Sequence, residues 1–183
     1  MMNMKNVINV GLFTVIFFGV CKLGAMEACL IYDASTDSSQ AETLKTLLEK
    51  KEFASVIDKQ DARGFTPLHY SAISGRLMCM DVLIRAGANP NIKDFAGNTA
   101  LHHAVIHARP ECVEILLRES KIDVKSEDLG RNTALDLAYY FERQSKRKDD
   151  SSLKIRSRIV KILEEFYTKN GLKLTPQYVI EGL

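Results

Sequence analysis

The stretch that decides the fold is Asp61-Ala-Arg-Gly-Phe-Thr-Pro-Leu-His-Tyr-Ser-Ala72, and its pattern recurs twice further along the chain. Residues 94–104 repeat it as Asp-Phe-Ala-Gly-Asn-Thr-Ala-Leu-His-His-Ala, and residues 128–138 as Asp-Leu-Gly-Arg-Asn-Thr-Ala-Leu-Asp-Leu-Ala. The three copies begin at Asp61, Asp94 and Asp128, so their spacing is nearly constant. Such a period indicates stacked units, each of which buries its apolar face against its neighbours.

Each unit has the local signals of two helices joined by a turn. Thr66 suits an N-cap, and Pro67 suits the first helical position, where its missing N–H costs nothing. Gly75 tolerates the left-handed backbone that ends a helix. A second helix over residues 77–85 has apolar side chains at helical spacing, and Gly87 ends it. An extended turn then leads into the next unit.

These residues resemble the ankyrin repeat. The match is carried by Thr66-Pro67-Leu68-His69, Gly75, Val82-Leu83-Ile84 and Ala86-Gly87-Ala88-Asn89. The resemblance implies an all-α fold, an α-solenoid of stacked helix-turn-helix ankyrin repeats joined by β-hairpin-like turns. It also implies that His69 and its equivalent His102 are structural residues that bond the neighbouring turn.

The repeat pattern divides the chain into seven predicted parts. A clear repeat spans 61–93 and another spans 94–127, in which Ala108 stands where the mid-repeat glycine is expected. The flanking parts are a signal peptide over 1–25, a polar linker over 26–40, a degenerate half-repeat over 41–60, a C-terminal repeat over 128–167 and a tail over 168–183. About 13 extra residues near 143–158 in the last repeat predict either a long loop or a helix extension. A closing helix with Ile155, Ile159, Ile162 or Leu163, and Phe166 on its apolar stripe is expected to follow.

The N-terminus has the layout of a secretory signal: Lys5, a mostly apolar run over 7–20, and small residues after it. The run is too short to span a bilayer comfortably, which takes about 20 residues. Cleavage is expected after Ala25 or Ala28, and the protein is expected to be exported, either periplasmic or secreted. The alternative is an uncleaved membrane anchor, and a lipid-modified cysteine is a weaker option.

Charge and cysteine usage exclude several classes of partner and site. Removal of 1–25 takes away Lys5 and Lys22, which leaves 23 basic residues against 23 acidic ones. A neutral chain gives no general argument for binding nucleic acid. Cys79 and Cys112 occupy equivalent positions in adjacent repeats, so they are expected to be buried thiols rather than a disulfide.

No catalytic or cofactor site is expected. The sequence shows no nucleophile with a general base, no glycine-rich phosphate loop and no paired carboxylates. His103 and His107 lie one helical turn apart, but no third ligand is in view for a metal. A metal-dependent enzyme is therefore the remotest hypothesis.

A basic segment over 143–161 carries eight Lys or Arg side chains against three carboxylates when the adjacent Glu142 is counted with it. Such a run is most often a solvated helix face. The alternative is a patch for lipid headgroups, which would act with an uncleaved anchor to hold the protein at a membrane surface.

The resemblance implies a scaffold that binds a protein partner through its concave face and turn tips, and the chain is expected to be a monomer. The predicted partner-binding residues are Arg63, Phe65, Ile73, Ser74, Lys93, Phe95, Asn98, Ile106, His107, Leu129, Tyr140 and Phe141. Several are large and apolar, as interaction surfaces are. The alternative is that Phe65 and Phe95 fold onto the next repeat, or that the 143–158 segment covers them.

Overall fold

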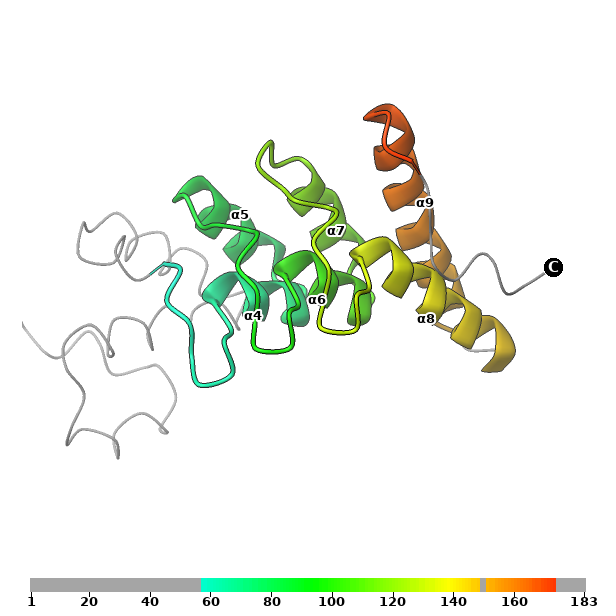
Figure 1. Cartoon of the computed structure of the whole chain (residues 1–183), viewed down its shortest axis with the longest axis horizontal. Coiled ribbons are helices and arrows are strands. Elements are labelled where there is room, and N and C mark those ends of the chain that lie inside the picture. The colour runs from blue at the N-terminus through cyan, green and yellow to red at the C-terminus, as the bar shows by residue number, and fades with distance from the viewer. Residues whose placement is uncertain (1–56, 149–150, 174–183) are drawn as a thin grey trace, which may run out of the picture.

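The computed structural model describes residues 57–148 and 151–173, which form three helix pairs (Figure 1). The predicted signal peptide, the linker and most of the degenerate half-repeat lie outside the described residues, as do residues 174–183 of the tail. The helices of the described part are α4 (Pro67–Ser74), α5 (Leu77–Arg85), α6 (Ala100–Ile106), α7 (Pro110–Leu117), α8 (Ala134–Lys148) and α9 (Leu153–Lys169).

The helices stack in two rows, which confirms the predicted α-solenoid. The inner helix α6 packs between α4 and α8, and the outer helix α7 packs between α5 and α9. Figure 1 shows the extended turns projecting along one edge of the stack. We call residues 61–66, 94–99 and 128–133, at the ends of these turns, the turn tips. The described residues contain no β-strand.

The inner helices begin as the sequence predicts. Thr66 and Thr99 are the N-caps of α4 and α6, and Pro67 occupies the first position of α4. In each cap the histidine one turn on accepts the backbone N–H of the threonine at its Nδ1, at 3.0 Å for His69 and 3.1 Å for His102. These bonds satisfy N–H groups that the helix itself leaves without partners.

The same histidines also join one repeat to the next. Nε2 of His69 lies 3.1 Å from the carbonyl oxygen of Asn98, and Nε2 of His102 lies 3.3 Å from that of Asn132. The structural role expected for both residues is therefore confirmed. In the third repeat Asp136 replaces the histidine, and its carboxylate accepts the backbone N–H and the hydroxyl of Thr133, so the local cap is kept.

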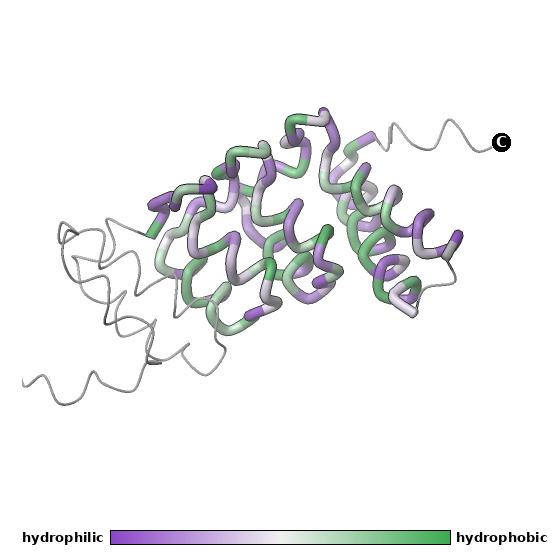
Figure 2. The backbone as a smooth tube through the Cα atoms, turned by 90° about the horizontal axis from the view of Figure 1, so that it is seen from below, coloured by the Kyte–Doolittle hydropathy of each residue, from purple (hydrophilic) through white to green (hydrophobic). Residues whose placement is uncertain are grey.

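The core runs continuously through the three pairs. Its fully buried side chains include Leu68, Met80, Leu83, Leu101, Leu116, Ile159 and Leu163. Figure 2 shows hydrophobic and hydrophilic residues alternating along each helix, as expected when one face of the helix is buried. Cys79 and Cys112 are both buried thiols that form no disulfide with each other, as predicted, and burial raises the pKa of the Cys112 thiol to about 11.

The last repeat differs from the others by helix extension rather than by a loop. The inner helix α8 has 15 residues, whereas α4 has eight and α6 has seven. Contacts between α8 and α9 stabilise the extension, including hydrogen bonds from Ser157 to Glu142 and from Tyr139 to Glu164.

One expectation for the closing helix is wrong. Ile159 and Leu163 lie in the core and Ile162 and Phe166 pack against it, but Ile155 is 44% exposed. Ile155 lies in the first turn of α9, outside the buried core.

Candidate functional site

The turn tips are rigid because an aspartate organises each one. The Asp94 carboxylate accepts the backbone N–H groups of Ala96 and Asn98, both at 2.8 Å. Asp61 and Asp128 bind the corresponding N–H groups of their own tips. Such side-chain bonds fix a turn that the backbone alone would leave loose.

Consecutive tips also bond to one another. The N–H of Phe95 donates to the carbonyl of Arg63 at 3.2 Å, and the N–H of Leu129 donates to that of Ala96 at 3.0 Å. This approach needs a glycine in the preceding tip. A Cβ on Gly64 would lie 2.7 Å from the nitrogen of Phe95, and one on Gly97 would lie 2.8 Å from that of Leu129. The tips therefore form one ordered column.

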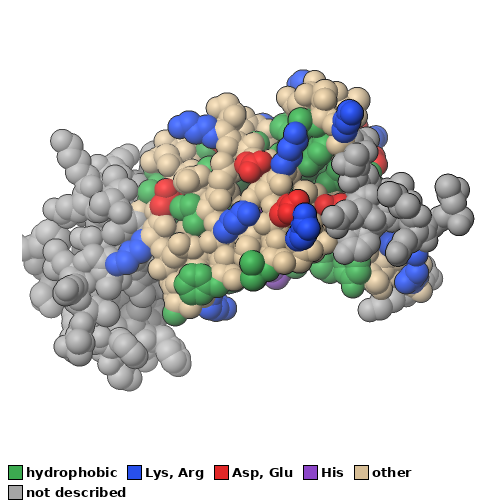
Figure 3. Space-filling model, viewed as in Figure 1, with side chains coloured by type: hydrophobic (Ala, Val, Ile, Leu, Met, Phe, Trp, Pro, Cys, Tyr) green, Lys and Arg blue, Asp and Glu red, His purple; other side chains and the backbone are tan. Residues whose placement is uncertain are grey.

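Two large apolar side chains project from this column. Phe95 and Leu129 follow the tip aspartates at equivalent positions, and they are 68% and 78% exposed. Figure 3 shows hydrophobic side chains at the edge of the molecule where the tips project. Two neighbouring apolar groups on a rigid backbone provide the anchors that a protein partner uses.

Phe65 behaves differently from Phe95. Its ring lies 5.0 Å from the ring of His103 in the next repeat, edge to face, and the Arg63 guanidinium covers it at 4.7 Å. Arg63 in turn donates to the hydroxyl of Tyr70. Of the two phenylalanines predicted at the turn tips, Phe65 is thus partly folded onto the next repeat, whereas Phe95 is exposed.

Further predicted site residues lie on the inner helices. Tyr140 is 40% exposed, and its ring meets the half-buried ring of Phe141 edge to face at 5.2 Å. His107 is exposed at the end of α6, and Ile106 beside it is half-buried. On α4, Ile73 and Ser74 are half-buried.

Two further polar site residues, Lys93 just before the second tip and Asn98 within it, have structural contacts. Lys93 is exposed, and its ammonium donates to the carbonyl of Glu127 at 2.8 Å. Asn98 is half-buried, and its Oδ1 atom is buried without a hydrogen-bond partner. Its backbone carbonyl accepts the bond from His69 described above. Both residues therefore also help to position the tips.

Sequence reasoning missed two residues at this surface. Tyr70 bonds both Asp61 and Arg63. It lies one helical turn before Ile73, and this spacing indicates that the two side chains share one face of α4. The Arg156 guanidinium lies over the ring of Phe141 at 4.7 Å and within 3.5 Å of the carbonyl oxygen of Val105. No local signal could have placed it there, because these partners come from two other helices.

The two histidines weighed for a metal site have different surroundings. Nε2 of His103 binds the buried Asp94 carboxylate at 2.8 Å, and the ring of His107 stacks on that of His103 at 6.1 Å. Burial raises the pKa of Asp94, but hydrogen bonds from His103 and the tip N–H groups outweigh it and hold the pKa below its usual value. Among residues 57–148 and 151–173, no group of three or more His, Cys, Asp and Glu side chains is placed to hold a metal.

Four basic side chains of the segment are engaged within the protein. Arg158 binds Glu111 at 2.7 Å and Glu114 at 2.8 Å, and Lys146 lies 3.1 Å from Glu142. Lys161 and Arg156 also have partners. The Arg158 contacts join α9 to α7 and the Arg156 contact joins it to α8, whereas the ion pairs of Lys146 and Lys161 lie within one helix. Together they reduce the charge available for lipid headgroups. Within the described residues, no helix is both long and apolar enough to span a membrane.

Comparison with known proteins supports the repeat assignment. The family model for ankyrin repeats, in three copies, matches residues 26–128. No curated protein matches the chain significantly. The match begins well before residue 57, so it includes residues in front of the described helices.

Proposed function

Because the chain belongs to the ankyrin repeat family, we propose that it is an exported scaffold that binds a protein partner through its turn tips and inner helices. Ankyrin repeats are typically non-catalytic modules for protein interaction, and they imply a protein partner. The choice of this surface as the binding site rests on one observation: Phe95 and Leu129 are both exposed, and they lie in neighbouring turn tips.

The physical basis of binding is preorganisation. The tips are already fixed by aspartate and inter-tip hydrogen bonds, so a partner would order few side chains when it binds. Phe95 and Leu129 supply apolar area in the column. Tyr140, Phe141 and His107 extend the predicted surface along the inner helices. We define these five residues as the binding face.

The decisive experiment is affinity capture with the chain that starts at Met26, followed by affinity measurement with the purified partner. A double variant, Phe95→Asp with Leu129→Asp, should weaken binding at least roughly tenfold, because loss of central anchors is the costliest change at an interface. Met78→Asp on α5 is the matched control, since Met78 is also an exposed apolar residue, at 64%. Circular dichroism would show that all variants keep their helices.

A partner that binds the native chain and the double variant with equal affinity would contradict the binding-face proposal. Weakening by Met78→Asp alone would instead indicate the outer helices as the site.

Export rests on the sequence of residues 1–25, and the mass of the N-terminal fragment of the mature protein tests it. A new N-terminus near Met26 or Cys29 would support cleavage and export. An intact Met1 would favour the alternative, a membrane-surface protein held by its N-terminus and by the basic side chains of 143–161.

A further inference from the structure

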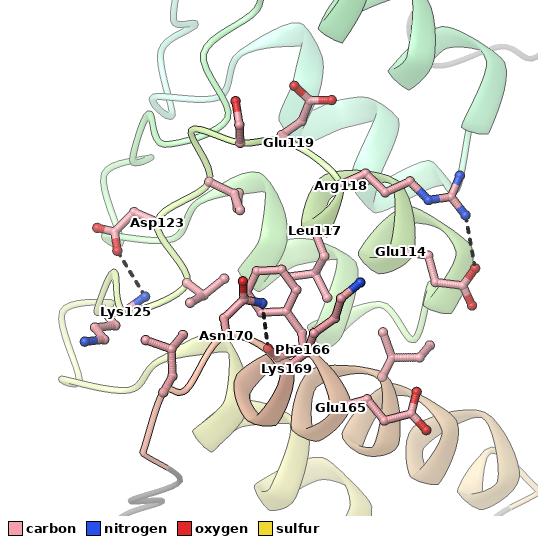
Figure 4. Close-up of a pocket in the computed structure, with 15 residues that line it drawn as sticks. Glu114, Leu117, Arg118, Glu119, Asp123, Lys125, Glu165, Phe166, Lys169 and Asn170 are labelled. Atoms are coloured by element: carbon pink, nitrogen blue, oxygen red, sulfur yellow. Dashed lines mark hydrogen bonds and ion pairs between the residues drawn. The ribbon is translucent and has the colours of Figure 1, made fainter.

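Two grooves beside the outer helices differ in their charge. The larger has a volume of about 940 Å³ and lies between the C-terminal halves of α7 and α9. Figure 4 shows Leu117 and Phe166 in this groove, with charged side chains around them. Its lining includes four carboxylates and three Lys or Arg side chains. The two signs nearly cancel, so this groove favours no particular charge in an occupant.

The smaller groove lies at the N-terminal ends of the outer helices. It has a volume of about 440 Å³, and α5, α7, α9 and the turns between inner and outer helices contribute to it. We call it the basal groove, and its lining includes Leu77, Arg109, Pro110, Lys154 and Ile155. The turn tips precede the inner helices, whereas the basal groove begins where the inner helices end. It is therefore a surface separate from the turn tips.

Apolar side chains flank the basal groove. Leu77 is the first residue of α5 and is 37% exposed, and Ile155, in the first turn of α9, is 44% exposed. Pro110 is the first residue of α7, which packs between those two helices. Neither Leu77 nor Ile155 belongs to the hydrophobic core. The basal groove thus offers apolar surface that folding leaves uncovered.

Contacts with the preceding helix pair restrict the position of Arg109. Its Nε donates to the carbonyl of Ile73, at the end of α4, at 3.2 Å. A Cβ on Gly75 would lie 3.0 Å from Cδ of Arg109 and 3.1 Å from its Nε, so the side chain runs close over this glycine. Arg109 nevertheless remains exposed. A ligand would therefore order this guanidinium at little cost.

Positive charge is in excess in the basal groove. Lys154 and Arg158 line it together with Arg109, whereas Glu111 is its one acidic lining residue. Arg158 already binds Glu111, at 2.7 Å. Within the described residues, neither Arg109 nor Lys154 forms an ion pair, and both are exposed. Two cations without acidic partners, beside apolar side chains, favour an anionic occupant that also has an apolar part.

We infer that the basal groove binds an acidic peptide segment of a protein partner. A large apolar side chain of the peptide lies between Leu77 and Ile155, and a neighbouring carboxylate binds Arg109 or Lys154. Arginine suits this role because its planar guanidinium can donate two parallel hydrogen bonds to one carboxylate. The inference does not depend on the proposed function, because the basal groove shares no residue with the binding face.

A peptide fits the basal groove better than a lipid surface does. A volume of about 440 Å³ is typical of sites that enclose a small ligand or a few side chains. Recognition of anionic lipids generally uses clusters of about four to eight basic residues. The basal groove has three, and one of them is already paired.

Fluorescence anisotropy of labelled hexapeptides with the full chain tests the inference. The probe contains two leucines flanked on each side by two glutamates. One reference peptide has serines in place of the leucines, and the other has lysines in place of the glutamates. We expect the probe to bind at least roughly tenfold more tightly than either reference, because binding needs both the apolar contact and the negative charge.

Two double variants with equal changes in net charge locate the bound probe. Arg109→Glu with Lys154→Glu should weaken binding of the probe at least roughly tenfold, because like charges then face each other. Arg118→Glu with Lys169→Glu, in the larger groove, is the matched control and should bind the probe as the native chain does. Lys154→Glu alone should weaken binding roughly threefold, which keeps the test decisive if the change at Arg109 disturbs the fold.

Equal binding of the probe to the native chain and to the Arg109 and Lys154 variants would overturn the inference. Equal binding of all three peptides, or no binding of the probe at about 1 mM, would also overturn it. Weakening by the control alone would locate the peptide in the larger groove. Binding of phosphatidylserine vesicles without binding of the probe would indicate a membrane surface instead.

The variant with Phe95→Asp and Leu129→Asp separates this inference from the proposed function. It should bind the probe as the native chain does, because both substitutions lie in the turn tips. If it lost the probe, the peptide would lie on the binding face and the basal groove would not be its site.

Discussion

Gly75 and Ala108 occupy the same position in successive helix pairs, and both have a left-handed backbone. Their φ angles are 72° and 53°. This region costs a residue with a Cβ about 1–2 kcal/mol, whereas glycine adopts it without that cost. The sequence marked Ala108 as a departure from the repeat pattern, and the structure shows that the turn keeps its shape in spite of the substitution.

An alanine in place of Gly75 and a glycine in place of Ala108 should therefore change the free energy of unfolding in opposite directions. Gly75→Ala should lower the free energy of unfolding by about 1–2 kcal/mol, through strain and a Cβ that lies 3.0 Å from Arg109. Ala108→Gly should raise it by about 0.5–1 kcal/mol, since relief of strain exceeds the entropy that glycine adds to the unfolded chain. Urea titrations of both variants test this, and changes of the same sign would contradict it.

His69 makes stability depend on pH. Burial lowers the pKa of His69 from 6.5 to about 4, since the charged ring would lose its hydration, and burial lowers the pKa of His102 as well. Above pH 6.5 the ring is neutral in both the folded and the unfolded state. Below that pH the unfolded state takes up the proton first, so stability falls as the pH falls from 6.5 towards 4.

Between pH 7 and pH 5 this should remove about 2 kcal/mol of stability through His69. Urea unfolding at several pH values measures the loss, and His69→Gln, which does not titrate, should show a smaller one. If the free energy of unfolding of both proteins depended on pH in the same way, His69 would not be the cause of the loss at low pH.

At the scale of elements, the last helix pair shows which contacts hold a helix in place. The outer helix α9 buries Ile159 and Leu163 in the core, and it also forms the ion pairs of Arg158 with Glu111 and Glu114. Exposed ion pairs contribute little, because water screens the charges and ordering long side chains is unfavourable. Apolar burial therefore dominates the docking of α9.

Leu163→Ala should lower the free energy of unfolding by about 2–5 kcal/mol, as expected for a cavity at a fully buried leucine. Arg158→Ala should leave it nearly unchanged. Chemical denaturation of both variants measures the two free energies of unfolding. A larger decrease in Arg158→Ala would show that the ion pairs, rather than apolar burial, dominate the docking of α9.

At the scale of the whole molecule, the stack protects its thiols. Cys79 and Cys112 lie on neighbouring outer helices, and neither is exposed to solvent. Alkylation of either requires outer helices to separate, and the raised pKa of Cys112 slows it further. Both should resist iodoacetamide at pH 8 in the native protein and react readily in urea. Peptide mapping by mass spectrometry checks each site, and rapid native labelling of Cys112 would show that the stack opens easily.

The sequence by itself determined the repeat, its helices and their ends. Thr66 with His69, Pro67 and Gly75 act on neighbours within a few residues, so their effect can be read from local spacing. The period then implied stacking, because one unit cannot bury its own apolar face. The buried thiols followed from the same equivalence of positions.

Only the tertiary structure decided which candidate side chains are open. Phe65 and Phe95 look alike in sequence, yet His103 and Arg63 cover the first and leave the second exposed. Arg156 reaches Phe141 because the extended α8 and α9 pack side by side. Exposure depends on what a neighbouring repeat places over a side chain, and that neighbour lies a full repeat away along the chain, beyond the reach of local patterns.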